Sequence, residues 1–169
     1  MLFRSWIYED THVIKNLDGT TYRTLTGIDL GAGRGQSYIA KYAKSTGLCQ
    51  WVVRCNGSGS IPWERVRVDS AGNVYFVARA EWANQTYISS NDANFTPVYG
   101  PVNSFGEGVL AKINSSGIFQ WVVQTGTIQQ DGGRSGRVSS INDVAIDDAT
   151  GDVYMVGIMN GPEIGRAHV

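Results

Sequence analysis

The sequence predicts an all-β protein in which antiparallel β-hairpins recur along the chain. One observation is a segment that occurs twice, over residues 40–53 and 111–123, with Ala-Lys, a glycine and Gln-Trp-Val-Val in the same order. A second observation is the pair of segments at residues 69–77 and 147–156, which share an Asp, a Gly and a Val-Tyr that begins an apolar run. Repetition of this kind is typical of architectures that stack copies of one supersecondary unit.

Each repeated segment has the composition of a strand, a tight turn and a second strand. Runs of β-branched and aromatic residues flank short stretches of Ser, Thr, Asn, Asp and Gly, which is the pattern of a hairpin. Two hairpins in series therefore make a four-stranded antiparallel unit. The unequal spacing of the copies is expected from connections of different length.

Residues 1–36 are predicted to form a degenerate or partial unit. Thr11–Lys15 and Thr21–Thr26 make its expected hairpin, joined at Asp18-Gly19, which is a favourable turn dipeptide. The Gly-Thr-Thr-Tyr of residues 19–22 is a fainter copy of the Gly-x-x-Tyr found in the later units.

The first well-defined hairpin is expected over residues 37–55. Strand alternation would place Cys49, Trp51 and Val53 on one face of its second strand. A large aromatic side chain in mid-strand is what stacked sheets bury. We therefore predict that Trp51 and its equivalent Trp121 pack between sheets rather than bind a ligand.

The two cysteines, Cys49 and Cys55, lie on or next to the same predicted strand. Six residues of strand span about 20 Å, whereas the Cα atoms of a disulfide lie within about 7 Å of each other. The cysteines are therefore expected to be unbridged and to act as small buried hydrophobic residues.

The second hairpin is predicted over Glu64–Ala80, where Val74–Ala78 is apolar on both faces and should have a sheet on either side. Asp69–Asn73 spaces its oxygen atoms loosely like a calcium loop but lacks the further carboxylates of an EF-hand. We interpret this segment as a hairpin turn. Residues 108–126 repeat the first hairpin, and Ile141–Asn160 opens another unit.

Residues 81–107 form the longest polar and irregular stretch of the sequence. A connection of this length without regular structure is usually functional or disordered. Aromatic and amide side chains together suit contacts with a carbohydrate or a peptide. The candidate ligand-binding residues are Trp82, Tyr87, Asn91 and Asp92. The alternative interpretation is an outer hairpin extended by insertion.

Charge and hydropathy argue against several classes of partner. Lys+Arg 14 against Asp+Glu 15 gives a net charge of −1, without the basic patch expected for a nucleic acid or an anionic membrane. No apolar stretch reaches the length of about 18 residues that a membrane span needs, and the acidic start does not match a signal peptide. Four Asn-x-Ser/Thr sequons are compatible with an extracellular or cell-surface location, and the compartment is left open.

The sequence marks no catalytic residue, metal site or cofactor site outside one glycine-rich loop, described below. Before the last seven residues there is one histidine, His12, and nothing places it beside a nucleophile as in a Ser-His-Asp triad. The spacing of this histidine from the two cysteines matches no usual zinc site. The carboxylates at the turns are not paired as in a glycosidase.

The repeated segments resemble the SBBP-type bacterial β-propeller repeat family, whose loose consensus is D-x-x-G-N-x-Y-x-x-G followed by a-K-x-x-x-x-G-x-x-x-W. The resemblance covers roughly residues 37–160. The matching residues are Asp69, Gly72, Asn73, Tyr75, Lys112, Gly117 and Trp121 in the complete unit, Asp147, Gly151, Asp152, Tyr154 and Gly157 in the next, and Lys41, Gly47 and Trp51 in the preceding one. The resemblance implies antiparallel four-stranded blades of an incomplete β-propeller, about two blades, and no single activity.

This resemblance favours a non-enzymatic scaffold that binds or adheres to a protein or glycan partner through its loops. The alternative is enzymatic, because Ile28–Gly35 resembles motif I of S-adenosylmethionine-dependent methyltransferases, with Gly31–Gly35 as the cofactor loop. The methyltransferase alternative requires a helix over Ser37–Lys44, whereas the repeat predicts a strand there.

The last seven residues, Glu163–Val169, resemble the in-frame translation of a widely used sequencing adapter and are excluded from the fold. The expected organisation is a degenerate or partial unit over residues 1–36, a truncated β-propeller repeat region over 37–162 and an adapter-derived tail over 163–169. The natural chain is expected to continue past Pro162.

Overall fold

The computed structural model describes residues 11–26, 37–57, 63–80, 86–90, 94–99, 107–124 and 139–159. Within these ranges every regular element is a β-strand and every strand pair is antiparallel, which confirms the all-β fold class. The strands are β1 (Thr11–Lys15), β2 (Thr21–Thr26), β3 (Ser37–Tyr42), β4 (Cys49–Gly57), β5 (Trp63–Val68), β6 (Val74–Ala80), β7 (Thr86–Ser90), β8 (Asn94–Tyr99), β9 (Glu107–Ile113), β10 (Phe119–Gln124), β11 (Ser139–Ile146) and β12 (Val153–Met159).

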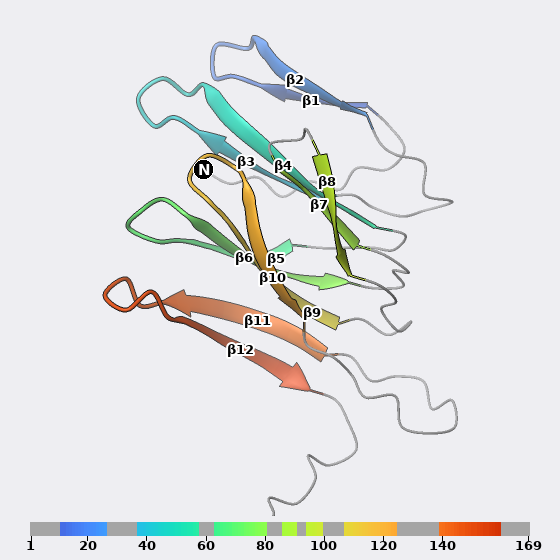
Figure 1. The fold of residues 1–169 in the computed structure, drawn as a ribbon. Helices are drawn as coiled ribbons and strands as arrows, with labels where there is room; N and C mark the ends of the chain where they lie inside the picture. Colours follow the sequence, from blue (N-terminus) through green and yellow to red (C-terminus); the bar gives the residue numbers. More distant parts are fainter. Residues whose placement is uncertain are drawn as a thin grey trace, which may run out of the picture.

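The strands form four sheets, which lie one over another in the order of the chain (Figure 1). Sheet 1 is β1-β2, sheet 2 is β3-β4-β7-β8, sheet 3 is β5-β6-β9-β10 and sheet 4 is β11-β12. Sheet 3 is the four-stranded unit predicted from two hairpins in series. Sheets 1 and 4 contain one hairpin each.

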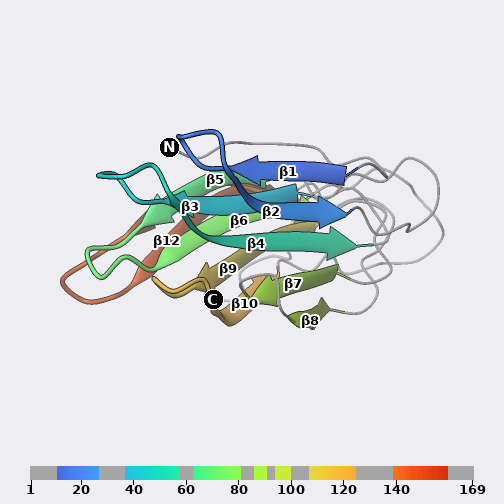
Figure 2. The same ribbon diagram turned by 90° about the horizontal axis from the view of Figure 1, so that it is seen from above.

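Five hairpins turn through a glycine in the left-handed region of backbone conformation. Their φ angles lie between 67° and 83°, at Gly19, Gly47, Gly72, Gly117 and Gly151. This conformation costs a residue with a Cβ atom roughly 1–2 kcal/mol, so a glycine at each turn favours the hairpin. The five turns lie at the same end of the stack (Figure 2).

The long connection between β6 and β9 contains a hairpin of its own, β7–β8. This hairpin does not extend sheet 3, to which β6 and β9 belong. It pairs with β4 of sheet 2 through Cys55 opposite Ile88, Asn56 opposite Tyr87 and Gly57 opposite Thr86. The alternative interpretation of residues 81–107 is an outer hairpin extended by insertion. The structure confirms a hairpin at one end of sheet 2, but β7–β8 is a separate hairpin paired with β4 and not an extension of an existing one.

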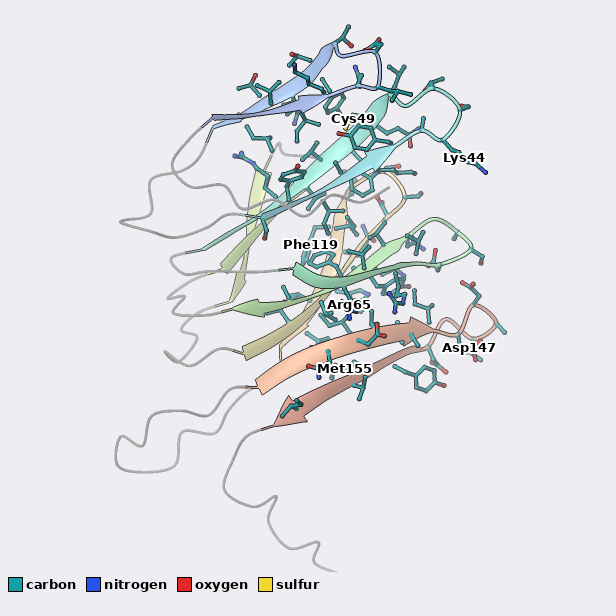
Figure 3. The ribbon with its side chains drawn as sticks, turned by 180° about the vertical axis from the view of Figure 1, so that it is seen from behind. Lys44, Cys49, Arg65, Phe119, Asp147 and Met155 are labelled. Carbon is teal, nitrogen blue, oxygen red and sulfur yellow. The ribbon has the colours of Figure 1, made fainter. Side chains whose placement is uncertain are left out.

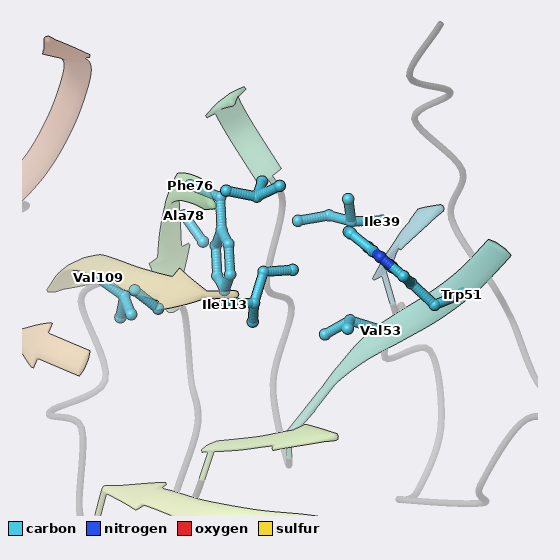
Figure 4. Close-up of a cluster of buried hydrophobic side chains, with 9 residues drawn as sticks. Ile39, Trp51, Val53, Phe76, Ala78, Val109 and Ile113 are labelled. Atoms are coloured by element: carbon cyan, nitrogen blue, oxygen red, sulfur yellow. The ribbon is translucent and has the colours of Figure 1, made fainter. Parts of the chain in front are cut away.

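Side chains at equivalent repeat positions face the same way through the stack. Ile39 and Trp51 of sheet 2 pack against sheet 3, and Leu110 and Trp121 of sheet 3 pack against sheet 4. Figure 4 shows Ile39 and Trp51 in the cluster that joins sheets 2 and 3. The prediction that the two repeated tryptophans pack between sheets is confirmed.

Strand β6 lies at the centre of the stack, as its apolar pattern predicts. It pairs with β5 on one side and with β9 on the other. Phe76 faces sheet 2 and Val77 faces sheet 4, and both side chains are fully buried. Burial of a large apolar side chain stabilises a fold by about 1.5–3 kcal/mol, so β6 anchors three of the four sheets.

The prediction that Cys49 shares a face with Trp51 and Val53 is wrong. Cys49 packs in the cluster between sheets 1 and 2, whereas the other two side chains face sheet 3. The register explains the difference, because Cys49 lies opposite Tyr42 while Trp51 lies opposite Lys41. One residue of β4 is thus a bulge, and a bulge inverts the alternation of faces.

Candidate functional site

The predicted ligand-binding residues fall mostly outside the described residues. Trp82, Asn91 and Asp92 are among those that the structure does not describe, and of Tyr87 it describes the backbone alone. Tyr87 lies in β7, between Asn56 of β4 and Pro97 of β8. The ladder therefore places one of the four candidates within sheet 2, next to its edge strand β8, and the ligand-binding role stays a prediction.

A shallow hollow of about 270 Å³ lies where sheet 3 meets sheet 4. Its lining residues come from β5, β11 and β12: Arg67, Asp143, Val144, Ala145, Tyr154, Met155 and Val156. Met155 lies on the last hairpin of the stack (Figure 3). The hollow combines an apolar wall with one ion pair, so it can hold an apolar or aromatic group beside a polar contact.

The ion pair in the hollow is formed by Arg67 and Asp143. Arg67 Nη2 donates to both carboxylate oxygens, at 2.7 and 3.0 Å, and its Nη1 donates to the Val66 carbonyl at 3.1 Å. The backbone N–H of Val144 donates to Asp143 Oδ1 at 2.8 Å. Because the two charges neutralise each other, the pair joins β5 to β11 and offers no free charge to a ligand.

Asp69 has a structural role at the turn between β5 and β6. Its carboxylate accepts hydrogen bonds from the backbone and the side chain of Asn73, both at 2.7 Å, and from the Tyr75 hydroxyl at 3.3 Å. Partial burial by itself would raise the pKa of Asp69, but these bonds and the Lys112 ammonium hold it below its usual value. The interpretation of Asp69–Asn73 as a hairpin turn is confirmed.

The described residues contain no group of three or more His, Cys, Asp or Glu side chains that could hold a metal ion. Cys49 is a free, buried cysteine whose thiol donates to the Trp51 carbonyl at 3.6 Å. Burial raises the pKa of this thiol, so the neutral form is favoured. The prediction of a small buried hydrophobic residue is confirmed for Cys49, and the side chain of Cys55 lies outside the described residues.

The glycine loop of the methyltransferase alternative, Gly31–Gly35, also lies outside the described residues. The segment after it is described, and Ser37–Tyr42 is strand β3, paired with β4. The helix that the alternative requires at this place is therefore not formed.

Sequence reasoning missed Arg67 and Asp143, the two charged residues of the hollow. They lie 76 positions apart in the chain, and neither belongs to a recognisable motif. Alternation along β5 indicates that Arg67 is exposed, but only the stacking of sheet 3 on sheet 4 brings it to Asp143.

Comparison of the chain with protein-family models, with curated proteins and with solved structures finds no match. The part of the chain that the structure describes contains no helix long and apolar enough to cross a membrane.

Proposed function

We propose that the chain is a repeat scaffold of the β-propeller type that binds a protein or glycan partner through its loops, without enzymatic activity of its own. Sheet 3 has the strand number and antiparallel order of one propeller blade. The packing of sheet on sheet through equivalent residues supports a radial repeat of the SBBP type.

The observation that carries the binding role is the β7–β8 hairpin. The insertion leaves sheet 3 after β6 and pairs with sheet 2, so a segment rich in aromatic and amide residues is joined to two sheets. Backbone pairing of β7 with β4 holds the described part of the insertion, including Tyr87, in sheet 2, and holding a binding segment in place lowers the entropic cost of association.

The test is a glycan array and a displayed peptide library probed with the purified chain. We expect a signal that the double substitution Trp82→Ala and Tyr87→Ala abolishes, because the aromatic contact area is lost. Val13→Ala is the control, since this exposed apolar side chain lies in β1, outside both the insertion and the hollow. A signal that survives the double substitution contradicts the assignment to the insertion.

The enzymatic alternative predicts a different outcome. Saturable micromolar binding of S-adenosylmethionine that Gly33→Val abolishes would overturn the proposal in favour of a methyltransferase, because the valine side chain would block approach of the cofactor to the loop backbone.

A further inference from the structure

One backbone carbonyl joins sheet 2 to the β9–β10 turn of sheet 3. Lys41 Nζ and Trp51 Nε1 both donate hydrogen bonds to the Ser115 carbonyl, at 2.9 and 3.0 Å. Trp51 also lies close against the same turn: a Cβ atom on Gly117 would stand 2.8 Å from the indole Cγ. We call Lys41 and Trp51 the first clamp. The first clamp holds a hairpin through hydrogen bonds to one turn carbonyl and through contact with the glycine two residues later.

The same pair of side chains recurs one sheet further on. Lys112 lies opposite Trp121 in the β9–β10 ladder, just as Lys41 lies opposite Trp51 in the β3–β4 ladder. We call Lys112 and Trp121 the second clamp. Within the described residues neither side chain donates a hydrogen bond, and both rest against the ring of Tyr75, with Lys112 Nζ 4.9 Å from its centroid.

Strand β12 repeats β6 in sequence but lacks one of its neighbours. β6 pairs with both β5 and β9, whereas in the described part of the chain β12 pairs with β11 alone. The apolar side chains Tyr154, Val156 and Ile158 of β12 are exposed. An unpaired edge beside exposed apolar side chains favours addition of another strand.

We propose that the second clamp and the free edge of β12 form a docking site for one further β-hairpin with the Ala-Lys, Gly and Gln-Trp pattern. The first strand of this partner hairpin pairs with β12 as β9 pairs with β6. The carbonyl two residues before its turn glycine accepts hydrogen bonds from Lys112 Nζ and Trp121 Nε1. Its glycine rests on the Trp121 indole, as Gly117 rests on that of Trp51.

The two hairpins of a second copy that carry the Ala-Lys, Gly and Gln-Trp pattern do not fit this site. Its β9–β10 hairpin is already paired with β6, and its turn is already held by the first clamp. Its β3–β4 turn is covered by Leu17, whose Cβ would stand 2.3 Å from a Cβ on Gly47. The occupant is therefore a partner hairpin of this pattern that is not already paired within a sheet. The site depends on the stacking of the sheets and not on the proposed binding of a glycan or protein by the loops.

The test titrates an unlabelled peptide with the sequence of residues 107–124 into the isotope-labelled full chain. We expect saturable shifts of the Trp121 indole N–H resonance and slower hydrogen exchange at alternate β12 amides. The same peptide with Gly117→Val should not bind, because a side chain at this position meets the indole and disfavours a positive φ.

Two substitutions in the chain separate the clamp from simple edge pairing. Trp121→Phe keeps an aromatic ring and removes the indole donor, and Lys112→Met keeps the stem and removes the charge. Each should weaken peptide binding by about 5- to 20-fold, the effect of one lost hydrogen bond. Lys41→Met is the matched control in the first clamp and should leave the affinity for the peptide unchanged.

Because an isolated hairpin is marginally stable in water, the same peptide sequence is also attached to the full chain through a flexible linker, which brings its effective concentration to about millimolar. The chain extended by the unchanged hairpin should unfold at a higher temperature than the chain extended by the hairpin with Gly117→Val. The proposal is overturned if neither the peptide nor the extension shows an effect, if Trp121→Phe has full affinity, or if the protected backbone amides lie in the edge strands β3 or β10 instead of in β12. Concentration-dependent self-association through β12 would overturn it in favour of a second copy.

Discussion

The β5–β6 and β11–β12 hairpins have the same sequence pattern and opposite surroundings. Both consist of two antiparallel strands joined by a turn with a glycine at a φ of 81°. Three successive residues of β6, Tyr75, Phe76 and Val77, are exposed by 2%, 0% and 0%, whereas their equivalents Tyr154, Met155 and Val156 of β12 are exposed by 60%, 47% and 62%.

The difference arises from the neighbours of each hairpin. β6 has a strand on either side and a sheet on each face, whereas the described part of the chain gives β12 only β11 on one side and sheet 3 on one face. The pattern of strand, turn and strand is thus sufficient to form the hairpin. The contribution of each side chain to the free energy of unfolding depends on the sheets that cover it.

The largest expected effect tests this difference in the cores of the two strands. Phe76→Ala should lower the free energy of unfolding by about 3–5 kcal/mol, because it leaves a cavity between sheets 2 and 3. The equivalent Met155→Ala should cost less than about 1 kcal/mol, since that side chain is half exposed. Urea unfolding of both variants measures the two values, and similar losses would contradict the burial assigned to β6.

A second prediction compares two turn glycines that share a φ of 81°. Gly151→Ala should cost about 1–2 kcal/mol from backbone strain alone, because no atom lies within 4 Å of the added Cβ. Gly117→Ala adds a clash with the buried indole of Trp51 and should cost about 2–4 kcal/mol. Thermal or urea unfolding distinguishes the two, and equal costs would mean that the indole moves aside freely.

A third prediction concerns the ion pair that ties the two hairpins together. A double-mutant cycle with Arg67→Gln and Asp143→Asn should give a coupling energy of about 0.3–1 kcal/mol, because both side chains are 43% exposed. The coupling should fall as salt is added. A coupling that is unchanged in molar salt would show that the pair is shielded from solvent more than its exposure indicates.

The smallest expected effect is a dependence of stability on pH through Asp69. Its pKa in the folded protein is lower than its usual value, so the contribution to stability is complete above the unfolded value of about 3.9. The contribution is lost as the pH falls through the folded value. Asp69→Asn should therefore flatten the decline of stability as the pH falls below about 4. If the unfolding midpoint of Asp69→Asn falls with pH as steeply as that of the unsubstituted chain, other carboxylates cause the sensitivity to acid.

Much of the fold could be predicted because each of the five repeat hairpins is a local structure. Thr11–Lys15 and Thr21–Thr26 were predicted as strands and are β1 and β2 with the same bounds. The apolar run at Val74–Ala78 likewise predicted a strand with a sheet on either side, and β6 is such a strand. In these cases strand propensity, a short turn and a glycine act within fewer than twenty residues.

The misses share a non-local cause. The bulge in β4 depends on the register between β3 and β4, and it places Cys49 against sheet 1 instead of sheet 3. The β7–β8 hairpin pairs with β4, from which β5 and β6 separate it in the chain, and the sequence of the insertion contains no signal for that choice. The candidate hollow at Arg67 and Asp143 likewise exists only because two sheets meet.

Local sequence accounts for the all-β class, for the five glycine turns and for the equivalence of the repeated hairpins, because these depend on backbone geometry and on residues close in the chain. Long-range contacts account for the sheet that receives the insertion, for the burial of β6 against the exposure of β12, and for the clamp of Lys41 and Trp51 on the Ser115 carbonyl. The physical reason is that a strand edge and a sheet face accept many partners. The choice among them depends on contacts between residues far apart in the sequence.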